Sequence, residues 1–277
     1  LYPKTPDFAP KARSVIFLYM DGGVSQVDSF DPKPQLAKEH GQAPRFKVDA
    51  TVFNNNGNIL KSPWDFHHYG ESGIPISDLF PHIGSCADDL CIMRSMTSFS
   101  PNHPNANYAL HCGHVLSGRP SMGAWVSYGL GTLSQNLPSY VVMHARSRHA
   151  EQSLFGRLWG SGFMPSQHQG VLLRSQGDPV LYLNNPAGVT REDRRAQIDA
   201  LTALNKAQHK RFADPSVLER IKQHEMAYRM QSSVPELMDL GKEPESTFEL
   251  YGNDARTPGT FAASCLNARR LAERGVR

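Results

Sequence analysis

Three aspartates near the start of the chain, Asp21, Asp28 and Asp31, are close enough in sequence to share one site. Asp21 directly follows the apolar run 14–20, which is typical of a strand buried on both faces of a sheet. Ligands of open α/β sheets bind outside the carboxyl ends of the strands, so Asp21 is a candidate metal ligand. Neighbouring carboxylates repel one another unless a cation offsets their charge, which makes Asp28 a second candidate. The alternative is that these residues only form turns or cap a helix.

Small residues between the aspartates could contact a substrate. Gly22 and Gly23 allow the backbone to approach a ligand closely. The Ser25 hydroxyl can donate a hydrogen bond to an anion, and its alternative role is in a turn. We therefore treat Gly22, Gly23 and Ser25 as candidate substrate-binding residues.

Arg94 lies near the end of a second apolar run, 90–96. Its guanidinium can pair with Asp21 or Asp28, or it can hold the oxyanion of a substrate. A purely structural ion pair is the alternative, and the sequence leaves both open.

His103, preceded by Asn102, lies in the polar loop before a helix that we expect from about 105 to 116. Neutral imidazole binds zinc and similar ions, so His103 is a candidate metal ligand. It is equally a candidate nucleophile or general base beside the metal, with Asn102 next to it. The start of the helix favours an anionic group nearby. The alternative is that Asn102 and His103 merely cap the helix.

The elements that must position these residues alternate between helices and short apolar strands, which predicts an α/β fold with a largely parallel sheet. A helical hairpin over 190–232 interrupts the alternation, and it either covers the sheet or gates the site. Its outer face could also be a docking surface in a larger surface assembly. The expected strands are 14–20, 90–96, 139–144 and 180–183, the last within the otherwise irregular stretch 145–189. We expect Ser77 to cap a helix that ends near 88–89, and further helices over 105–116, 121–130 and 257–275, the last with Phe261, Cys265, Ala268 and Ala272 on one face. In the hairpin, Thr190 should open the first helix, with Ile198, Leu201 and Leu204 on its apolar face, and Asp214-Pro215 should open the second.

Composition excludes several classes of protein. The 277 residues are 39% hydrophobic and 20% charged, as in soluble globular proteins. The net charge of +3 comes without a block of Lys or Arg, so nucleic acid is not an expected partner. No apolar run approaches the roughly 20 residues that span a bilayer. The four cysteines lack zinc or redox spacing, and we expect free, mostly buried thiols.

The two ends of the chain lead to expectations about processing. Residues 1–13 are rich in Pro and Lys, and we expect a linker that follows a removed signal peptide. The helix 257–275 ends at Gly275, and Val276-Arg277 is expected to begin a new strand. We therefore expect residues 14–277 to be the N-terminal part of a single, longer domain.

A set of motifs across nearly the whole chain resembles one family, the exported bacterial domain-of-unknown-function family fifteen-oh-one. Together these motifs are far more specific than any one of them. They are Asp21-Gly-Gly, Ser25-Gln-Val-Asp-Ser-Phe-Asp-Pro-Lys-Pro34, Ser72-Gly-Ile-Pro-Ile-Ser-Asp-Leu-Phe-Pro-His82, Asp88-Asp-Leu-Cys-Ile-Met-Arg-Ser-Met96, Gly118-Arg-Pro-Ser-Met-Gly123, Tyr128-Gly-Leu-Gly131, Trp159-Gly-Ser-Gly-Phe163, Arg174-Ser-Gln-Gly-Asp-Pro179 and Tyr228-Arg-Met-Gln-Ser-Ser233.

The resemblance implies a relation to the alkaline phosphatase and sulfatase superfamily, an alkaline-phosphatase-like sandwich and a periplasmic or extracellular location. In that superfamily an Asp at the end of the first strand binds a divalent metal, which matches Asp21. The superfamily nucleophile aligns with His103, or with Tyr108 in another register, and the expected Arg is missing. Formylglycine chemistry is therefore not expected.

The leading hypothesis is an exported metal-dependent hydrolase of sulfate or phosphate esters, either small molecules or polysaccharides. Its metal would be zinc, calcium or magnesium, acting as a Lewis acid and generating a nucleophile. In the superfamily the remaining ligands come from a later segment, so we expect residues 1–277 alone to bind metal weakly and to be inactive. The rival hypothesis is a non-catalytic surface protein of the same fold that binds a glycan or a protein partner.

Overall fold

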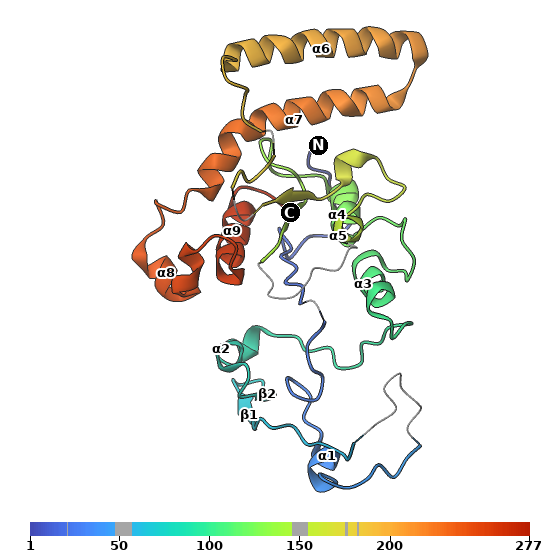
Figure 1. Ribbon diagram of the computed structural model, residues 1–277, viewed down its shortest axis with the longest axis vertical. Helices are drawn as coiled ribbons and strands as arrows, with labels where there is room; N and C mark the ends of the chain where they lie inside the picture. The colour runs from blue at the N-terminus through green and yellow to red at the C-terminus, as the bar shows by residue number, and fades with distance from the viewer. Residues whose placement is uncertain (21, 48–56, 146–154, 175–176, 182) are drawn as a thin grey trace. The chain divides into compact units, whose positions relative to one another are not determined.

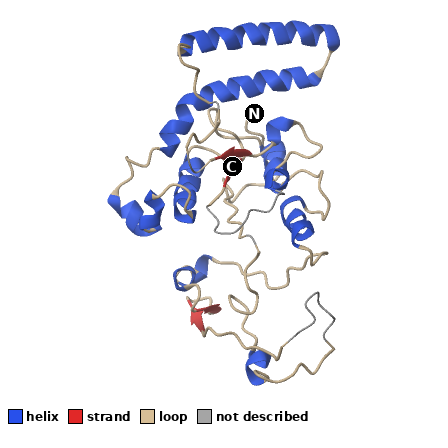
Figure 2. Cartoon of the chain, in the orientation of Figure 1, coloured by secondary structure: helices blue, strands red, loops and turns tan. Residues whose placement is uncertain are grey.

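A computed structural model describes residues 1–20, 22–47, 57–145, 155–174, 177–181 and 183–277. The chain divides into two compact units. Unit 1 comprises Leu1–Phe17 and Ser98–Arg277, and unit 2 comprises Leu18–Thr97. Helices predominate in the described residues, and strands are short (Figures 1 and 2).

Unit 2 is small and contains an antiparallel hairpin that the sequence did not predict. Strands β1 (Phe66–Tyr69) and β2 (Ile74–Ser77) pair in it, with Phe66 opposite Ser77. We expected Ser77 to cap a helix, but Ser77 is buried at the end of β2 and its hydroxyl donates to the backbone oxygen of Asp28 at 2.5 Å. The helical turns of this unit are α1 (Pro34–Lys38), α2 (Pro81–Gly84) and η1 (Ala87–Asp89).

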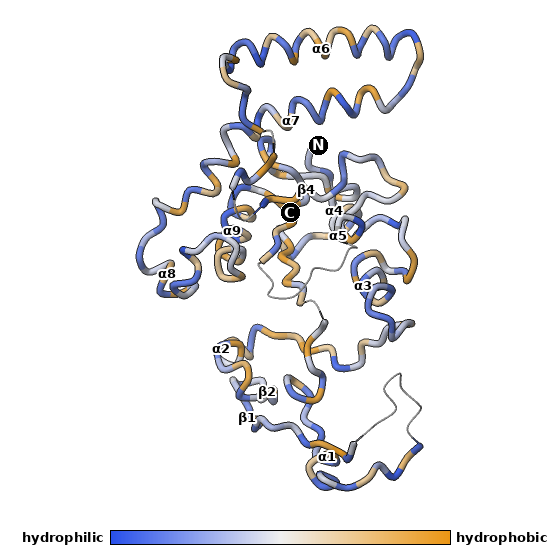
Figure 3. Tube along the Cα trace, viewed as in Figure 1, coloured by the Kyte–Doolittle hydropathy of each residue, from blue (hydrophilic) through white to orange (hydrophobic). Residues whose placement is uncertain are grey.

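Unit 1 holds the longer helices and one pair of parallel strands. Strands β3 (Val141–Met143) and β4 (Val171–Leu173) pair in register, and Figure 3 shows the hydrophobic character of β4. The strand predicted at 139–144 is thus confirmed over its middle residues, Val141–Met143. The helical elements of the unit are α3 (His103–Cys112), α4 (Met122–Leu130), α5 (Phe155–Leu158), η2 (Ser166–His168), α6 (Arg191–Phe212), α7 (Pro215–Met238), α8 (Glu245–Tyr251), η3 (Asn253–Arg256) and α9 (Phe261–Glu273).

Helices α6 and α7 lie side by side as an antiparallel pair, as the sequence predicted (Figure 1). Thr190 forms a capping box with Asp193, and Pro215 occupies the first turn of α7 behind the Asp214 cap. Ile198 is buried between the helices, whereas Leu201 and Leu204 are exposed, so the apolar face is narrower than predicted. No helix in the described part of the chain has the length and apolar character of a bilayer crossing.

The main core of unit 1 lies where α7, α9 and β4 meet. Leu173 of β4 packs there with residues of both helices. Val234 and Leu237 of α7 are fully buried. The buried members of this cluster are Leu137, Leu173, Leu183, Met230, Val234, Leu237, Leu271 and Val276.

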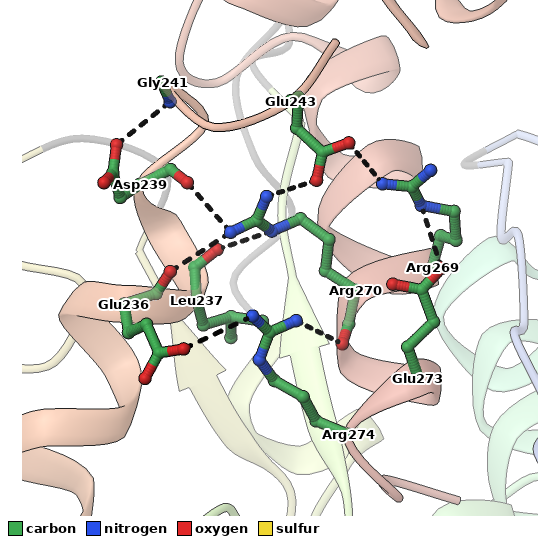
Figure 4. A network of polar contacts seen from close by, with 9 residues as sticks. All are labelled: Glu236, Leu237, Asp239, Gly241, Glu243, Arg269, Arg270, Glu273 and Arg274. Atoms are coloured by element: carbon green, nitrogen blue, oxygen red, sulfur yellow. Dashed lines mark hydrogen bonds and ion pairs between the residues drawn. The ribbon is translucent and has the colours of Figure 1, made fainter.

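A buried arginine joins α9 to the end of α7 (Figure 4). The side chain of Arg270 is only 6% exposed and forms an ion pair with Glu243. Its guanidinium also donates to the backbone oxygens of Glu236, Leu237 and Asp239 at 2.8–3.1 Å. The last carbonyls of a helix have no partner within the helix, so Arg270 supplies the bonds that the end of α7 needs.

Three of the predicted strands are wrong. The described backbones of 14–20, 90–96 and 180–181 with 183 form no strand. In the first run, the Val15 amide donates to the oxygen of Arg277 at 2.7 Å, without strand structure in the described residues around it. Apolar composition favours a strand only when a partner strand completes the hydrogen bonds, and that partner is not encoded locally.

The predicted apolar face of helix 257–275, formed by Phe261, Cys265, Ala268 and Ala272, is only partly buried. Ala268 is buried, but Phe261 is 53% exposed and Cys265 is only half-buried. Leu266 and Leu271 are buried in their place, because α9 turns Arg270 toward α7. The stop at Gly275 is confirmed, since its φ is 82° and its amide donates to the oxygen of Ala272.

The four cysteines are free, as predicted, but Cys86 and Cys91 are exposed rather than buried. Burial raises the pKa of the Cys112 and Cys265 thiols, which favours their protonated, unreactive form.

A second buried polar cluster holds η2 against α4. His168, only 3% exposed, has its Nδ1 atom 2.9 Å from the Ser127 hydroxyl, which lies 2.7 Å from that of Ser139. Burial, followed by the charge of Lys4, lowers the pKa of His168 below its ordinary value. The folded protein therefore favours neutral His168.

We predict that replacing Arg270 with Met lowers the free energy of unfolding by about 3–5 kcal/mol, because Glu243 and three backbone oxygens lose a buried cation. Chemical denaturation measures the change. Arg274→Met, at the residue that caps the end of the same helix, is the matched control, because its ion pair with Glu236 is 3.8 Å long and both side chains are more exposed than that of Arg270. We expect the control to cost less than about 1 kcal/mol. Equal losses in both variants would contradict this account of the network.

We predict that the free energy of unfolding falls as the pH drops below about 6.5, the ordinary pKa of histidine. In this range His168 binds a proton in the unfolded chain more readily than in the folded protein, where its pKa is lowered. His168→Gln keeps a polar side chain that does not titrate and should weaken this dependence. Some dependence should remain, since burial also lowers the pKa of His111. Melting temperatures between pH 5 and 7 test the prediction, with exposed His82→Gln as control. An unchanged slope in His168→Gln would show that His168 is not responsible.

Candidate functional site

The acidic loop of unit 2 is a set of tight turns. Gly22 and Gly23 have φ angles of 87° and 79°, in the region that favours glycine. The Ser25 hydroxyl donates to Asp28 Oδ2 at 2.6 Å, and the backbone oxygen of Ser25 accepts from the Ser29 hydroxyl. Ser25 therefore forms part of the turn and orients the carboxylate of Asp28.

The second carboxylate of the loop, Asp31, already has a cationic partner. Asp31 forms an ion pair with Lys33, and the hydrogen bond from Lys33 is the largest cause that lowers the pKa of Asp31. The charge of Arg94 acts in the same direction. Arg94 lies in an exposed turn, and the structure brings its charge near Asp31 rather than giving it an ion pair with Asp28 among the described residues.

His103 is the first residue of α3 and is exposed, in unit 1. Helix α3 begins two residues earlier than predicted and ends at Cys112, before Gly113. Asn102 occupies the N-cap position of α3, but its side chain makes no capping hydrogen bond. Tyr108, the other candidate for the nucleophile position, is buried.

The predicted site residues do not all belong to one unit of the chain. Asp21 lies outside the described residues, and the described candidates divide between the two units. Within the described ranges, no three His, Cys, Asp or Glu side chains are grouped so that they could hold a metal ion. Asp28 offers the hard oxygen ligand that calcium or magnesium prefers, but the described residues alone do not fit a complete metal site.

A pocket of about 50 Å³ lies at the carboxyl ends of β3 and β4, where sequence analysis identified no site. Apolar side chains of both strands line it, together with Arg174, Ser264 and Asn267. Asn267 is 6% exposed, and its Oδ1 atom has no hydrogen-bond partner among the described residues. A buried acceptor without a donor costs about 1–3 kcal/mol, so this atom marks a position where a donor is needed.

An exposed cluster of aromatic side chains lies on unit 1. Trp125 contacts Tyr128 and Phe163 edge to face, with ring centroids 6.3 and 6.1 Å apart. These three rings are 47–70% exposed. Lys4 lies over the Tyr128 ring at 4.8 Å. Large exposed rings gathered in one patch are typical of a binding surface.

Both features had weak signals in the sequence. Arg174 directly follows an apolar triplet, as a ligand-binding residue at a strand end does, but we had assigned 145–189 mainly to irregular structure. Asn267 is a polar residue within the apolar pattern of its helix. The sequence pattern does not indicate that its side-chain amide lacks a hydrogen-bond partner. Trp125 and Tyr128 are three residues apart on one helix face, whereas Phe163 joins them only in the tertiary structure.

Comparison with known proteins gives a family but no activity. No curated protein and no solved structure matches the chain. The family model described as protein of unknown function (DUF1501) matches residues 12–277, which includes nearly all of both units. This extent of match establishes that the chain belongs to the DUF1501 family.

Proposed function

We propose that this protein is an exported hydrolase of anionic esters, of the alkaline phosphatase and sulfatase type. The proposal assigns a divalent cation to Asp21 and Asp28, and it gives His103 the role of a further ligand or of the attacking group. Arg94 would contact the oxyanion of a sulfate or phosphate ester. The family resemblance supplies the class of reaction, and zinc, calcium and magnesium are all retained as candidate ions.

The observation that carries the proposal is the structure of the acidic loop. The loop presents Asp28 in a fixed orientation, because Ser25 bonds its carboxylate and Ser77 bonds its backbone oxygen. Gly22 and Gly23, which have positive φ angles, give the backbone ahead of Asp28 two positions without a side chain. Carboxylate oxygens held in a fixed orientation by a loop are ligands that hard cations such as calcium and magnesium prefer. The exposed position of His103 at the start of α3 is compatible with a role toward an anion.

We predict that the protein, purified in the form in which the cell makes it, retains one or two tightly bound divalent ions after dialysis. Asp21→Ala should lose them, because the substitution removes a charged oxygen ligand. Elemental analysis measures the metal content. Asp7→Ala, at an exposed aspartate of the linker, is the control and should retain the metal.

The same preparations then distinguish the possible roles of His103. If metal is present, hydrolysis of sulfate and phosphate esters should fall with His103→Ala. A loss of metal in this variant would assign His103 as a ligand, and retention would assign it to the attacking step. A protein without metal in either the original or the Asp7→Ala form would rule out the proposed hydrolase.

A second function, binding of a glycan without catalysis, is favoured by the aromatic patch of Trp125, Tyr128 and Phe163. The flat face of an aromatic ring packs against the apolar C–H face of a sugar ring. Lys4 beside Tyr128 adds a positive charge that suits an acidic polysaccharide. His103 stands at the position that the superfamily nucleophile occupies. This difference is also compatible with a protein that binds a glycan but does not hydrolyse it.

We predict that Trp125→Ala weakens retention of the protein in gels that contain acidic polysaccharides. The Kd should rise about tenfold or more, because a stacked aromatic side chain contributes about 1–3 kcal/mol in comparable stacking sites. Affinity electrophoresis measures the change. Trp64→Ala, at a partly exposed tryptophan of unit 2, is the control. Equal migration of the original protein with and without polysaccharide would reject this function.

A further inference from the structure

The pocket at the ends of β3 and β4 combines apolar walls with a few polar groups, as small-ligand sites do. Met143 and Leu173 are the last residues of the two parallel strands, and Met238 closes the pocket from the end of α7. The carboxyl ends of parallel strands are the usual place for ligands in sheets of this kind. Its volume of about 50 Å³ accommodates a few water molecules or a small organic ligand.

The polar groups of the pocket favour an anion. Arg174 is exposed, and no described residue forms a side-chain hydrogen bond or ion pair with its guanidinium. Its backbone is held by a hydrogen bond from its amide to the oxygen of Pro179 at 2.7 Å. No carboxylate is among the described lining residues. The first turns of α9, at Ala263 and Ser264, also line the pocket, and the start of a helix favours negative charge.

Asn267 adds a requirement that an anion alone does not meet. Its buried Oδ1 atom accepts hydrogen bonds and has no donor in the described structure. A carboxylate cannot donate, whereas a hydroxyl can. A hydroxyl also suits the carboxamide in its other orientation, because it both donates and accepts. The ligand should therefore carry a negative charge and, a short distance away, a hydroxyl.

We propose that this pocket binds a small hydroxy carboxylate, whose negative end pairs with Arg174 and whose hydroxyl bonds Asn267. The carbon atoms between the two groups contact Met143, Leu173 and Met238. Such a ligand is either a free hydroxy acid or the acid end of a sugar. The site shares no residue with the proposed ester-hydrolysis site, so each can be tested without the other.

Ligand-observed NMR titration of the whole protein tests the proposal, with glycolate as the probe. Acetate lacks the hydroxyl, and ethylene glycol lacks the charge. Each should bind at least about tenfold more weakly than glycolate, because each loses one hydrogen bond or charge contact with the pocket. Glucuronate is the second probe. Binding of glucuronate together with glycolate would identify a sugar acid as the source, and binding of glycolate alone would identify a free hydroxy acid.

Two variants assign the binding to this pocket. Arg174→Gln, at an exposed position, should weaken glycolate binding about tenfold or more, while Arg211→Gln on the helical hairpin should leave it unchanged. Asn267→Leu should make glycolate and acetate bind equally, because the hydroxyl loses its partner. Equal binding of glycolate and acetate to the original protein, no effect of Arg174→Gln, or no binding at millimolar concentration would each overturn the proposal. The last result would mean that only water occupies the pocket.

Discussion

The organisation of unit 1 depends on the insertion of one guanidinium group, that of Arg270, beneath the end of a long helix. Three backbone oxygens at the end of α7 accept its hydrogen bonds, and Glu243 balances its charge. Hydrogen bonds from Arg269, which has the larger effect, and from Arg270 hold the pKa of Glu243 below its ordinary value. This carboxylate therefore stays ionised at neutral pH. A buried charge is tolerated when it is paired and hydrogen-bonded, and Arg270 has an ion-pair partner and four hydrogen bonds.

The same contact positions the surroundings of the pocket. Arg270 binds the backbone at Leu237 and Asp239 (Figure 4). Met238, which lies between these two residues in the chain, forms one wall of the pocket. One helical turn before Arg270, Asn267 faces the pocket. The hydrophobic cluster around Val234 and Leu271 holds the two helices together at this end. The polar network thus sets the end of α7 and the orientation of α9, and the pocket lies between them and the strands.

The acidic loop of unit 2 is held mainly by short-range hydrogen bonds, in contrast to the long-range contacts of Arg270. Its turns form from residues only three or four positions apart, such as Ser25 with Asp28 and with Ser29. Glycines with positive φ and short hydroxyl-to-carboxylate bonds are local features, so sequence analysis identified the loop as a unit. The partners of its charges were harder to predict. Lys33 pairs with Asp31, and the charge of Arg94 reaches the same carboxylate from a turn far along the chain.

The sequence alone determined the family, the long helices and the residues that end them. Thr190, Asp214 with Pro215, and Gly275 act within one helical turn, and each begins or ends a helix where the sequence predicted. Strands at 14–20 and 90–96 were predicted wrongly, because an apolar run does not specify its pairing partner. Only the tertiary structure turned Arg270 and Asn267 inward and joined them to residues about thirty or more positions away. Local hydrogen bonds decide where a helix starts and stops, whereas the face that it buries is decided by the long-range contacts that satisfy its polar groups.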